Sequence, residues 1–330
     1  MNQNKGFMNI KAFILSFLVF SICFSTRGQV AFGDSIKEKI KFKLVEDDPT
    51  KFSKWSLGVG LGYYLVSNKI SPLTFTGTGF YHFNEDYKLD FRMGISLKND
   101  EERNPIEIEK LRFSEYQITI HKRLLSKISL KNRQLNYKRD EIGAQLFKSK
   151  YIPVSQKKRL ALDLDFGINY LQISDFEDIN LGNNPTDIGE IPKIVGNSSY
   201  TSFTLGFSLV SSRYLKYQLD KKEEFTVGYV RYYINYSYAF SHRLEIYEDP
   251  NSSPIAENQE ETFVSIYNSG FKFGIEAHDH LVSGPISSYY GFEIGWRPHF
   301  HDVNTTLDHI RGTGLYMMFS VGLRLAELPF

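Results

Sequence analysis

The chain has 330 residues, a formal net charge of +1 and 15% aromatic residues. A near-neutral balance provides no basic field, so the sequence gives no reason to expect a nucleic-acid partner. The single cysteine, Cys23, lies in an apolar N-terminal run, which excludes disulfides and thiol chemistry from the rest of the chain. The length suits one large barrel or two small domains.

The first 28 residues have the pattern of a secretory signal peptide. Lys5 and Lys11 precede an apolar run over residues 12–25. Thr26 and Gly28 then occupy the −3 and −1 positions of a cleavage site. We therefore predict export of the chain and cleavage near Gly28.

Two other interpretations of this N-terminus are weaker. A membrane anchor needs roughly 20 apolar residues, more than this run supplies. A lipoprotein anchored through Cys23 lacks the small residue expected just before the cysteine. The predicted organisation is a signal peptide at 1–28, a periplasmic segment at 29–54 with a possible extra strand at 36–45, and a barrel at 55–330.

Alternation of apolar and polar residues dominates the remaining sequence, and period 2 indicates β-strands. In residues 87–97, every second side chain from Tyr87 to Leu97 is apolar, while Lys88, Asp90 and Arg92 fall on the opposite face. The same pattern occurs at 55–65, 160–170, 203–209, 230–240, 271–277, 290–296 and 315–325. In a soluble sandwich the apolar face would meet a second sheet, whereas in a transmembrane barrel it would meet lipid.

Strand length and the composition of the polar face favour the barrel. The alternating segments extend over roughly 10–16 residues, whereas globular strands average about 5–6 and membrane-spanning strands need about 9–11. The polar face is rich in Gly, Ser and Asn, which suits the crowded inner side of a curved sheet. Aromatic residues also gather near strand ends, as an interfacial girdle requires: Trp55, Tyr63, Tyr87, Tyr170, Tyr290 and Trp296.

The connecting segments give a topology. Three long polar segments at 174–199, 241–261 and 299–312 are predicted to face outward, because outer-membrane barrels have long outer loops and short periplasmic turns. Turns are then predicted at 156–158, 213–224 and 279–286. About eleven strands can be counted, and bacterial single-chain barrels have even numbers, so we predict an all-β, antiparallel transmembrane barrel of twelve strands, with ten as the alternative.

The C-terminal residues "RLAELPF" end a predicted strand on Phe330. This ending resembles the assembly signal of bacterial outer-membrane barrels, and with a signal peptide ending in "GQ" the chain resembles the small barrel proteins of the Bacteroidota. The resemblance implies outer-membrane lipid and the outer-membrane assembly machinery as partners. The chain is too short for the 22-stranded importers, which argues against energised uptake of large ligands.

Charged residues on the polar face are the first candidates for a functional site. Unpaired charges in a narrow lumen are costly, and both signs occur in similar number, so we expect paired ladders that fill the barrel; a selective narrow pore is the alternative. The predicted lumen-facing charges are Lys88, Asp90, Arg92, Asp163, Asp165, Arg231, Lys272, Glu276, Glu293, Arg297 and Arg324.

Histidines are the second candidates. His299, His301 and His309 offer a weak outer-loop metal site, although polar loop histidines explain the pattern more simply. His82 and His121 lie within predicted strands and are the only bases that a barrel-embedded lipid hydrolase could use.

Neither of these two has a catalytic motif around it, and no phosphate-binding loop opens a helix, so no cofactor is predicted. We therefore predict a non-enzymatic outer-membrane barrel, either a narrow channel for small solutes or a structural or assembly component that binds protein partners. The alternatives are the embedded hydrolase and a secreted soluble β-protein.

Overall fold

The computed structural model describes residues 35–39, 41–51, 53–65, 73–97, 112–143, 146–178, 193–219, 222–247, 256–257, 263–280, 286–303 and 314–326. The predicted signal peptide, His309 and Phe330 lie outside these ranges and stay predictions. Within the described ranges, no helix is long and apolar enough to cross a membrane.

The described residues form β-strands throughout. Their bounds are β1 (Ser35–Lys39), β2 (Lys43–Glu46), β3 (Trp55–Leu65), β4 (Leu73–His82), β5 (Tyr87–Ser96), β6 (Arg112–Gly143), β7 (Leu146–Asp178), β8 (Lys193–Leu219), β9 (Lys222–Tyr247), β10 (Ala256–Glu257), β11 (Phe263–Tyr267), β12 (Ser269–His280), β13 (Ile286–Trp296), β14 (His299–Val303) and β15 (Leu315–Ala326).

The chain divides into two compact units. The smaller one comprises residues 1–43, 131–156 and 219–221, and in it β1 pairs in parallel with the beginning of β7. The larger one comprises the remaining residues and contains the sheet described next. The domain boundary predicted at residue 54 is not tested by this division and stays a prediction.

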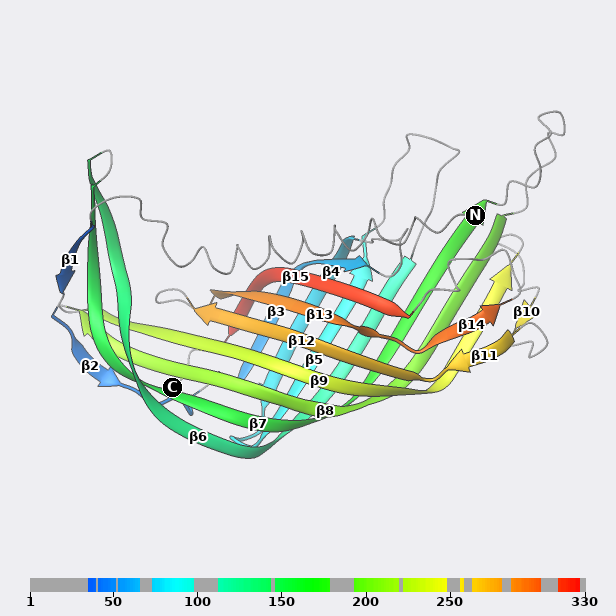
Figure 1. Cartoon of the computed structure of the whole chain (residues 1–330), viewed down its shortest axis with the longest axis horizontal. Helices are drawn as coiled ribbons and strands as arrows, with labels where there is room; N and C mark the ends of the chain where they lie inside the picture. The colour runs from blue at the N-terminus through cyan, green and yellow to red at the C-terminus, as the bar shows by residue number, and fades with distance from the viewer. Residues whose placement is uncertain are drawn as a thin grey trace, which may run out of the picture. The chain divides into compact units, whose positions relative to one another are not determined.

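Ten strands of the larger unit close into an antiparallel barrel. The strand order is β3-β4-β5-β6-β7-β8-β9-β12-β13-β15, and β15 pairs back onto β3 with Gly322 opposite Gly60. In Figure 1 the red β15 accordingly lies beside the blue β3. The β7–β8 pairing, with Arg159 opposite Ser212, completes the ring. The predicted all-β barrel is therefore confirmed with the alternative number of ten strands.

The prediction of twelve strands was wrong because β6 and β7 are longer than expected. β6 continues to Gly143 and β7 begins at Leu146, so residues 156–158, predicted to be a turn, lie inside β7. A turn at 156–158 implied an additional strand ending there, but these residues continue β7 of the β6–β7 hairpin.

Long and short connections alternate around the barrel. The β3–β4, β5–β6, β7–β8, β9–β12 and β13–β15 connections share one end, here called the loop end, because consecutive strands are antiparallel. The C-terminal ends of β4 and β12 lie at the opposite end, here called the turn end, where residues 83–86 connect β4 to β5. The two-stranded sheet of β11 and β14 continues the β12–β13 pairing at the loop end.

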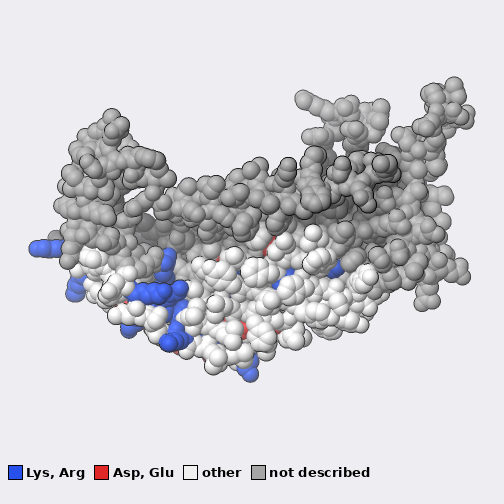
Figure 2. Space-filling model, viewed as in Figure 1, with Lys and Arg blue, Asp and Glu red and all other residues white. Residues whose placement is uncertain are grey.

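The outer face of the barrel is apolar and exposed. Along β3, Leu57, Val59 and Leu61 keep 63%, 58% and 49% of their surface exposed, while the intervening residues point inward. The same alternation occurs on β5, β7, β8, β9 and β15. Figure 2 shows that most of the visible outer face is without charge. A contiguous apolar surface of this extent is the mark of a face that contacts lipid or protein.

Candidate functional site: the barrel interior

The interior of the barrel contains a network of buried charges centred on Glu293 of β13. This carboxylate is 0% exposed and accepts hydrogen bonds from Arg92 at 3.1 and 3.3 Å. The hydroxyls of Tyr233 and Tyr316 each donate to it at 2.6 Å, and Lys272 lies 3.4 Å away. Five donors from four strands therefore meet on one carboxylate, which fits the rule that a buried charge must be paired and hydrogen-bonded.

Glu115 of β6 extends this group across the barrel. Its carboxylate lies 3.3 Å from Arg92 and accepts a hydrogen bond from the hydroxyl of Tyr64. Lys272 in turn donates to the side chain of Gln117 at 2.8 Å. The group thus has two carboxylates facing two cations. Tyrosine hydroxyls donate further hydrogen bonds to the carboxylates, and the amide of Gln117 accepts one from Lys272.

A second group surrounds His121. Its Nδ1 lies 2.7 Å from Asp165 and its Nε2 lies 2.9 Å from Asp90. A carboxylate only accepts hydrogen bonds, so the contact between Nδ1 and Asp165 is a hydrogen bond when Nδ1 carries the hydrogen. Arg231 also binds Asp165, at 2.7 Å, and reaches Asp90 at 3.5 Å and Glu276 at 3.3 Å.

Charges nearer the turn end are also paired. Lys88 lies 2.8 Å from Asp90 and donates to the hydroxyl of Tyr229 at 3.1 Å. Arg123 donates to Asp163 at 3.1 Å. The Arg123–Asp163 contact joins the neighbouring strands β6 and β7, and the Lys88–Tyr229 contact joins β5 to β9 across the interior.

An aromatic layer fills the interior at the loop end. The tilted rings of Tyr64 and Phe113 lie with their centroids 4.2 Å apart. The guanidinium of Arg297 lies 4.0 Å from the ring centroid of Tyr316 and 4.6 Å from that of Tyr64. The buried cluster consists of Tyr64, Phe113, Leu171, Tyr200, Ala239, Tyr316 and Met318. Arginine over aromatic faces is a favourable cation–π arrangement, so the rings of this layer help to hold the buried guanidinium of Arg297.

Inner glycines make room for tyrosine rings and do not leave an open lumen. Gly60 and Gly322 lie opposite each other, and a Cβ on Gly60 would lie 2.6 Å from the hydroxyl of Tyr289. That hydroxyl shares a 2.8 Å hydrogen bond with Thr76. A ring lying flat over inner glycines is a recognised way to complete a curved sheet.

The structure places the eleven predicted lumen charges on the inner face of the barrel and joins most of them in the two groups and pairs described above. Several members of these groups were not predicted from the sequence: Tyr64, Glu115, His121 as an ion-pair partner, Arg123, Tyr233 and Tyr316. Alternation along β6 accounts for three of them, because Glu115, His121 and Arg123 all fall on the inner side of that strand. On this strand only His121 was a candidate from the sequence, as the base of a hydrolase.

The histidine candidates have different outcomes. His299 and His301 lie in β14, opposite Tyr267 and Ser265, and the third predicted ligand is outside the described residues, so this metal site stays a prediction. His121 faces two carboxylates, and the nearby hydroxyl of Ser208 donates to Asp165 at 2.8 Å. His82 is buried, with its ring 5.2 Å from that of Phe80.

Comparisons with known proteins add little to this geometry. No protein-family model matches the chain, and no curated protein matches it. Similar solved structures include OmpT (in-vitro folded), an outer membrane protein of Vibrio cholerae, at 8% identity, with 86% of this chain and 99% of that chain covered and a TM-score of 0.18. Another is an anion-selective porin from Comamonas acidovorans, at 8% identity, covering 83% and 98%, with a TM-score of 0.19.

Similarities at these scores carry no argument about this chain. The strand order, the closure of β15 onto β3 and the apolar outer face define the class: the fold is a closed, antiparallel, outer-membrane-type β-barrel of ten strands.

Proposed function

We propose that the chain is a non-enzymatic protein of the outer membrane whose barrel is closed by its own side chains, and that it serves as a structural or assembly component. The observation that carries this proposal is the contrast between the two faces of the barrel wall. The outer face exposes apolar side chains, and the inner face buries charges of both signs in contact with one another.

Lipid is the solvent that fits the outer face. In water, exposed Leu57, Val59 and Leu61 on one strand, repeated around a closed ring, would drive aggregation. A closed barrel has no free backbone edge, which is the condition for strands to cross hydrocarbon. The membrane interface would be met by exposed aromatic residues at the turn end, among them Trp55, Tyr81 and Tyr87.

The paired interior favours a filled barrel over an open pore. A selectivity ring concentrates one sign of charge at one height. Here Arg92 faces Glu293 and Glu115, and Arg231 faces Asp165, so opposite charges meet within each group. The aromatic layer also fills the interior of the barrel at the loop end. A narrow channel remains the second candidate, because barrels of ten strands lie between filled and open sizes.

A lipid hydrolase is less well supported. His121 has carboxylates at both ring nitrogens and Ser208 binds a carboxylate, so this group lacks the hydroxyl-to-imidazole contact of a nucleophile and its base. The test is whether wild-type protein in detergent releases products from phospholipid or lipid A. Hydrolysis by the wild type that is lost in His121→Ala or His82→Ala would support the hydrolase.

The finer assignments are part of the same proposal. We retain export through a signal peptide at 1–28, membership of the Bacteroidota-type small barrels, and outer-membrane lipid, the assembly machinery and small solutes or protein partners as the molecules that it meets. Nucleic acid is not among them.

Fractionation of native cells with a gel of boiled and unboiled samples tests location and closure of the sheet. We expect the protein in the outer membrane, with a mobility that shifts on heating. Recovery in the soluble fraction without detergent would end the proposal. In a planar bilayer we expect little or no steady conductance, and stable porin-sized steps from pure protein would favour the channel.

A further inference from the structure

A small cavity lies inside the barrel, between the two charged groups and the turn end. It has a volume of about 40 Å³, and a neighbouring cavity of about 20 Å³ shares Thr78, Glu276, His278 and Arg324 in its lining. Each can hold a water molecule or a solute of similar size, because one water needs roughly 10–15 Å³ measured in this way.

The lining of the larger cavity carries more positive than negative side chains. Its charged residues are Lys88, Arg92, Arg231 and Arg324, together with Asp90 and Glu276. Both carboxylates are already engaged, Asp90 by Lys88 at 2.8 Å and Glu276 by Arg231 at 3.3 Å. Arg92 uses carboxylates outside the lining, at 3.1 and 3.3 Å.

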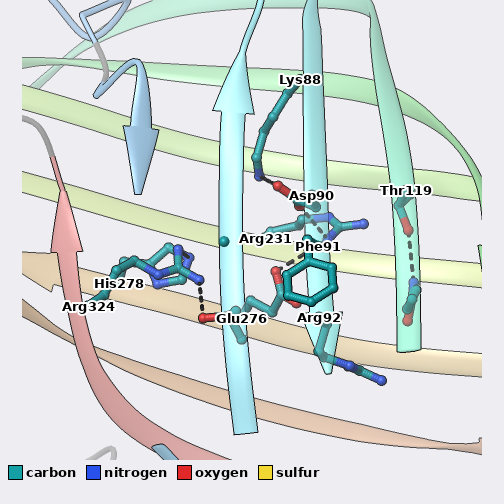
Figure 3. A pocket seen from close by; sticks show the side chains of 12 residues that line it. Lys88, Asp90, Phe91, Arg92, Thr119, Arg231, Glu276, His278 and Arg324 are labelled. Carbon is teal, nitrogen blue, oxygen red and sulfur yellow. Dashed lines mark hydrogen bonds and ion pairs between the residues drawn. The ribbon is translucent and has the colours of Figure 1, made fainter. Parts of the chain in front are cut away.

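Arg324 differs from these cations. Its side chain is buried, with 7% of the residue exposed, and among the described residues no carboxylate lies within 4.0 Å of its nitrogens. One terminal nitrogen contacts His278 Nε2 at 2.7 Å and the other donates to Thr78 at 3.1 Å. Its Nε has no hydrogen-bond partner. Figure 3 shows Arg324 and His278 together on one side of the cavity, with Arg231 and Asp90 across from them.

The neutral partners of Arg324 compensate its charge only in part. The rings of Phe80 and Tyr289 lie with their centroids 5.4 Å from the guanidinium carbon, a distance at which cation–π attraction is effective. A guanidinium cannot lose its proton in a protein, so burial cannot be relieved by neutralising it. A buried charge without a counter-charge is strongly disfavoured.

We propose that the cavity binds a small monovalent inorganic anion, of the size of chloride, beside Arg324. The anion supplies a counter-charge in direct contact, since no described carboxylate lies within 4.0 Å of the Arg324 nitrogens, and it accepts a hydrogen bond from the Nε–H. The cavity volume excludes larger organic anions. This inference is independent of conductance, because an anion enclosed as the barrel folds would satisfy Arg324 whether or not the lumen is open.

Bromide diffraction on the wild-type protein tests the site directly. The protein is refolded and crystallised in sodium bromide, and anomalous scattering locates the halide. We expect a bromide peak in the cavity within hydrogen-bond distance of Arg324. An anomalous map without a peak there, from crystals in which the side chain of Arg324 is well ordered, would overturn the proposal and assign the cavity to water.

A thermal measurement links the anion to this side chain. Protein is refolded into vesicles in sodium chloride or in sodium gluconate at equal ionic strength, and the midpoint of heat denaturation is read from the gel shift. We expect the wild-type midpoint to be a few degrees higher in chloride, because a ligand that binds only the folded state stabilises it. Equal midpoints in the two salts would count against the site.

Two variants make the comparison specific. Arg324→Gln removes the charge and should lose the difference between the salts. Lys122→Gln changes an exposed lysine on the outer side of β6 and should keep it. A salt difference that persists in Arg324→Gln would overturn the proposal. If Arg324→Gln does not fold, the bromide map of the wild-type protein decides.

Discussion

The buried carboxylate of Glu293 offers the sharpest test of how this barrel is held together. Glu293→Gln keeps the shape of the side chain and removes its charge. One amide oxygen then replaces two carboxylate oxygens that together face Arg92, Lys272, Tyr233 and Tyr316. The tyrosine hydroxyls can rotate to accept from the new amide, but the two cations cannot, because they only donate.

The expected loss of stability depends on which partners the two cations keep in the variant. Arg92 keeps Glu115 at 3.3 Å, whereas Lys272 keeps only the neutral side chain of Gln117 at 2.8 Å. One carboxylate then faces two buried cations. Removing one partner of a buried pair typically costs about 3–5 kcal/mol, so we expect Glu293→Gln to lower the free energy of unfolding by that amount. This corresponds to a ratio of folded to unfolded protein that is smaller by roughly two to three and a half powers of ten.

Urea unfolding in lipid vesicles, followed by the gel shift on heating, measures this loss. Glu276→Gln is the matched control. The Glu276 side chain is 26% exposed, and its partner Arg231 keeps Asp165 at 2.7 Å and Asp90 at 3.5 Å, so we expect a loss below about 1 kcal/mol. The reasoning is refuted if Glu293→Gln unfolds at the wild-type urea concentration, or if the two variants lose equal stability.

Three further predictions concern the wall and the ends of the barrel. Val59→Lys, in the middle of β3 on the exposed apolar face, should cost about 2–4 kcal/mol in the same urea titration, whereas Asp86→Lys in the exposed β4–β5 turn should cost less. Gly60→Val should press on the backbone oxygen of Val321 as well as on the Tyr289 hydroxyl and cost at least about 1–3 kcal/mol, while Gly94→Ala, whose added Cβ would meet only Phe113 at 3.6 Å, should be tolerated. Epitope tags after residues 184 and 253 should be labelled on intact cells, and a tag after residue 85 should need a permeabilised outer membrane; labelling of all three on intact cells would contradict the assignment of the two ends.

The face of the sheet on which each side chain lies could be predicted from local sequence, because side chains alternate between the two faces of a strand. In residues 87–97 the alternation alone separates Phe91, which is exposed on the outer face, from Arg92, which is buried in the network. The number of strands was harder to predict. The β6–β7 hairpin continues well past the apolar alternation through basic and polar residues, so its sequence gives no sign of where each strand ends.

The pairing of the inner charges could not be predicted at all. Arg92 and Glu293 are 201 positions apart and lie on β5 and β13, which are not neighbours in the sheet. Their contact depends on the number of strands and on the stagger of each strand against the next, since these set which residues share a height inside the barrel. Composition can show that both signs are present in similar number, but only the closed ring determines which carboxylate meets which guanidinium.

Adjacent tyrosines were a sequence signal for the filling of the barrel. Two consecutive residues of a strand point to opposite faces, so a Tyr-Tyr pair must place one ring inside. Tyr63 is 42% exposed and Tyr64 is 1% exposed; Tyr232 is 44% exposed and Tyr233 is 4% exposed. Each inner ring extends into the barrel interior and donates its hydroxyl to a buried carboxylate of another strand: Tyr64 to Glu115, and Tyr233 to Glu293. An inner face with Tyr between glycines and charges therefore predicts a filled lumen, because the glycines give the rings a place to lie and the carboxylates give their hydroxyls a partner.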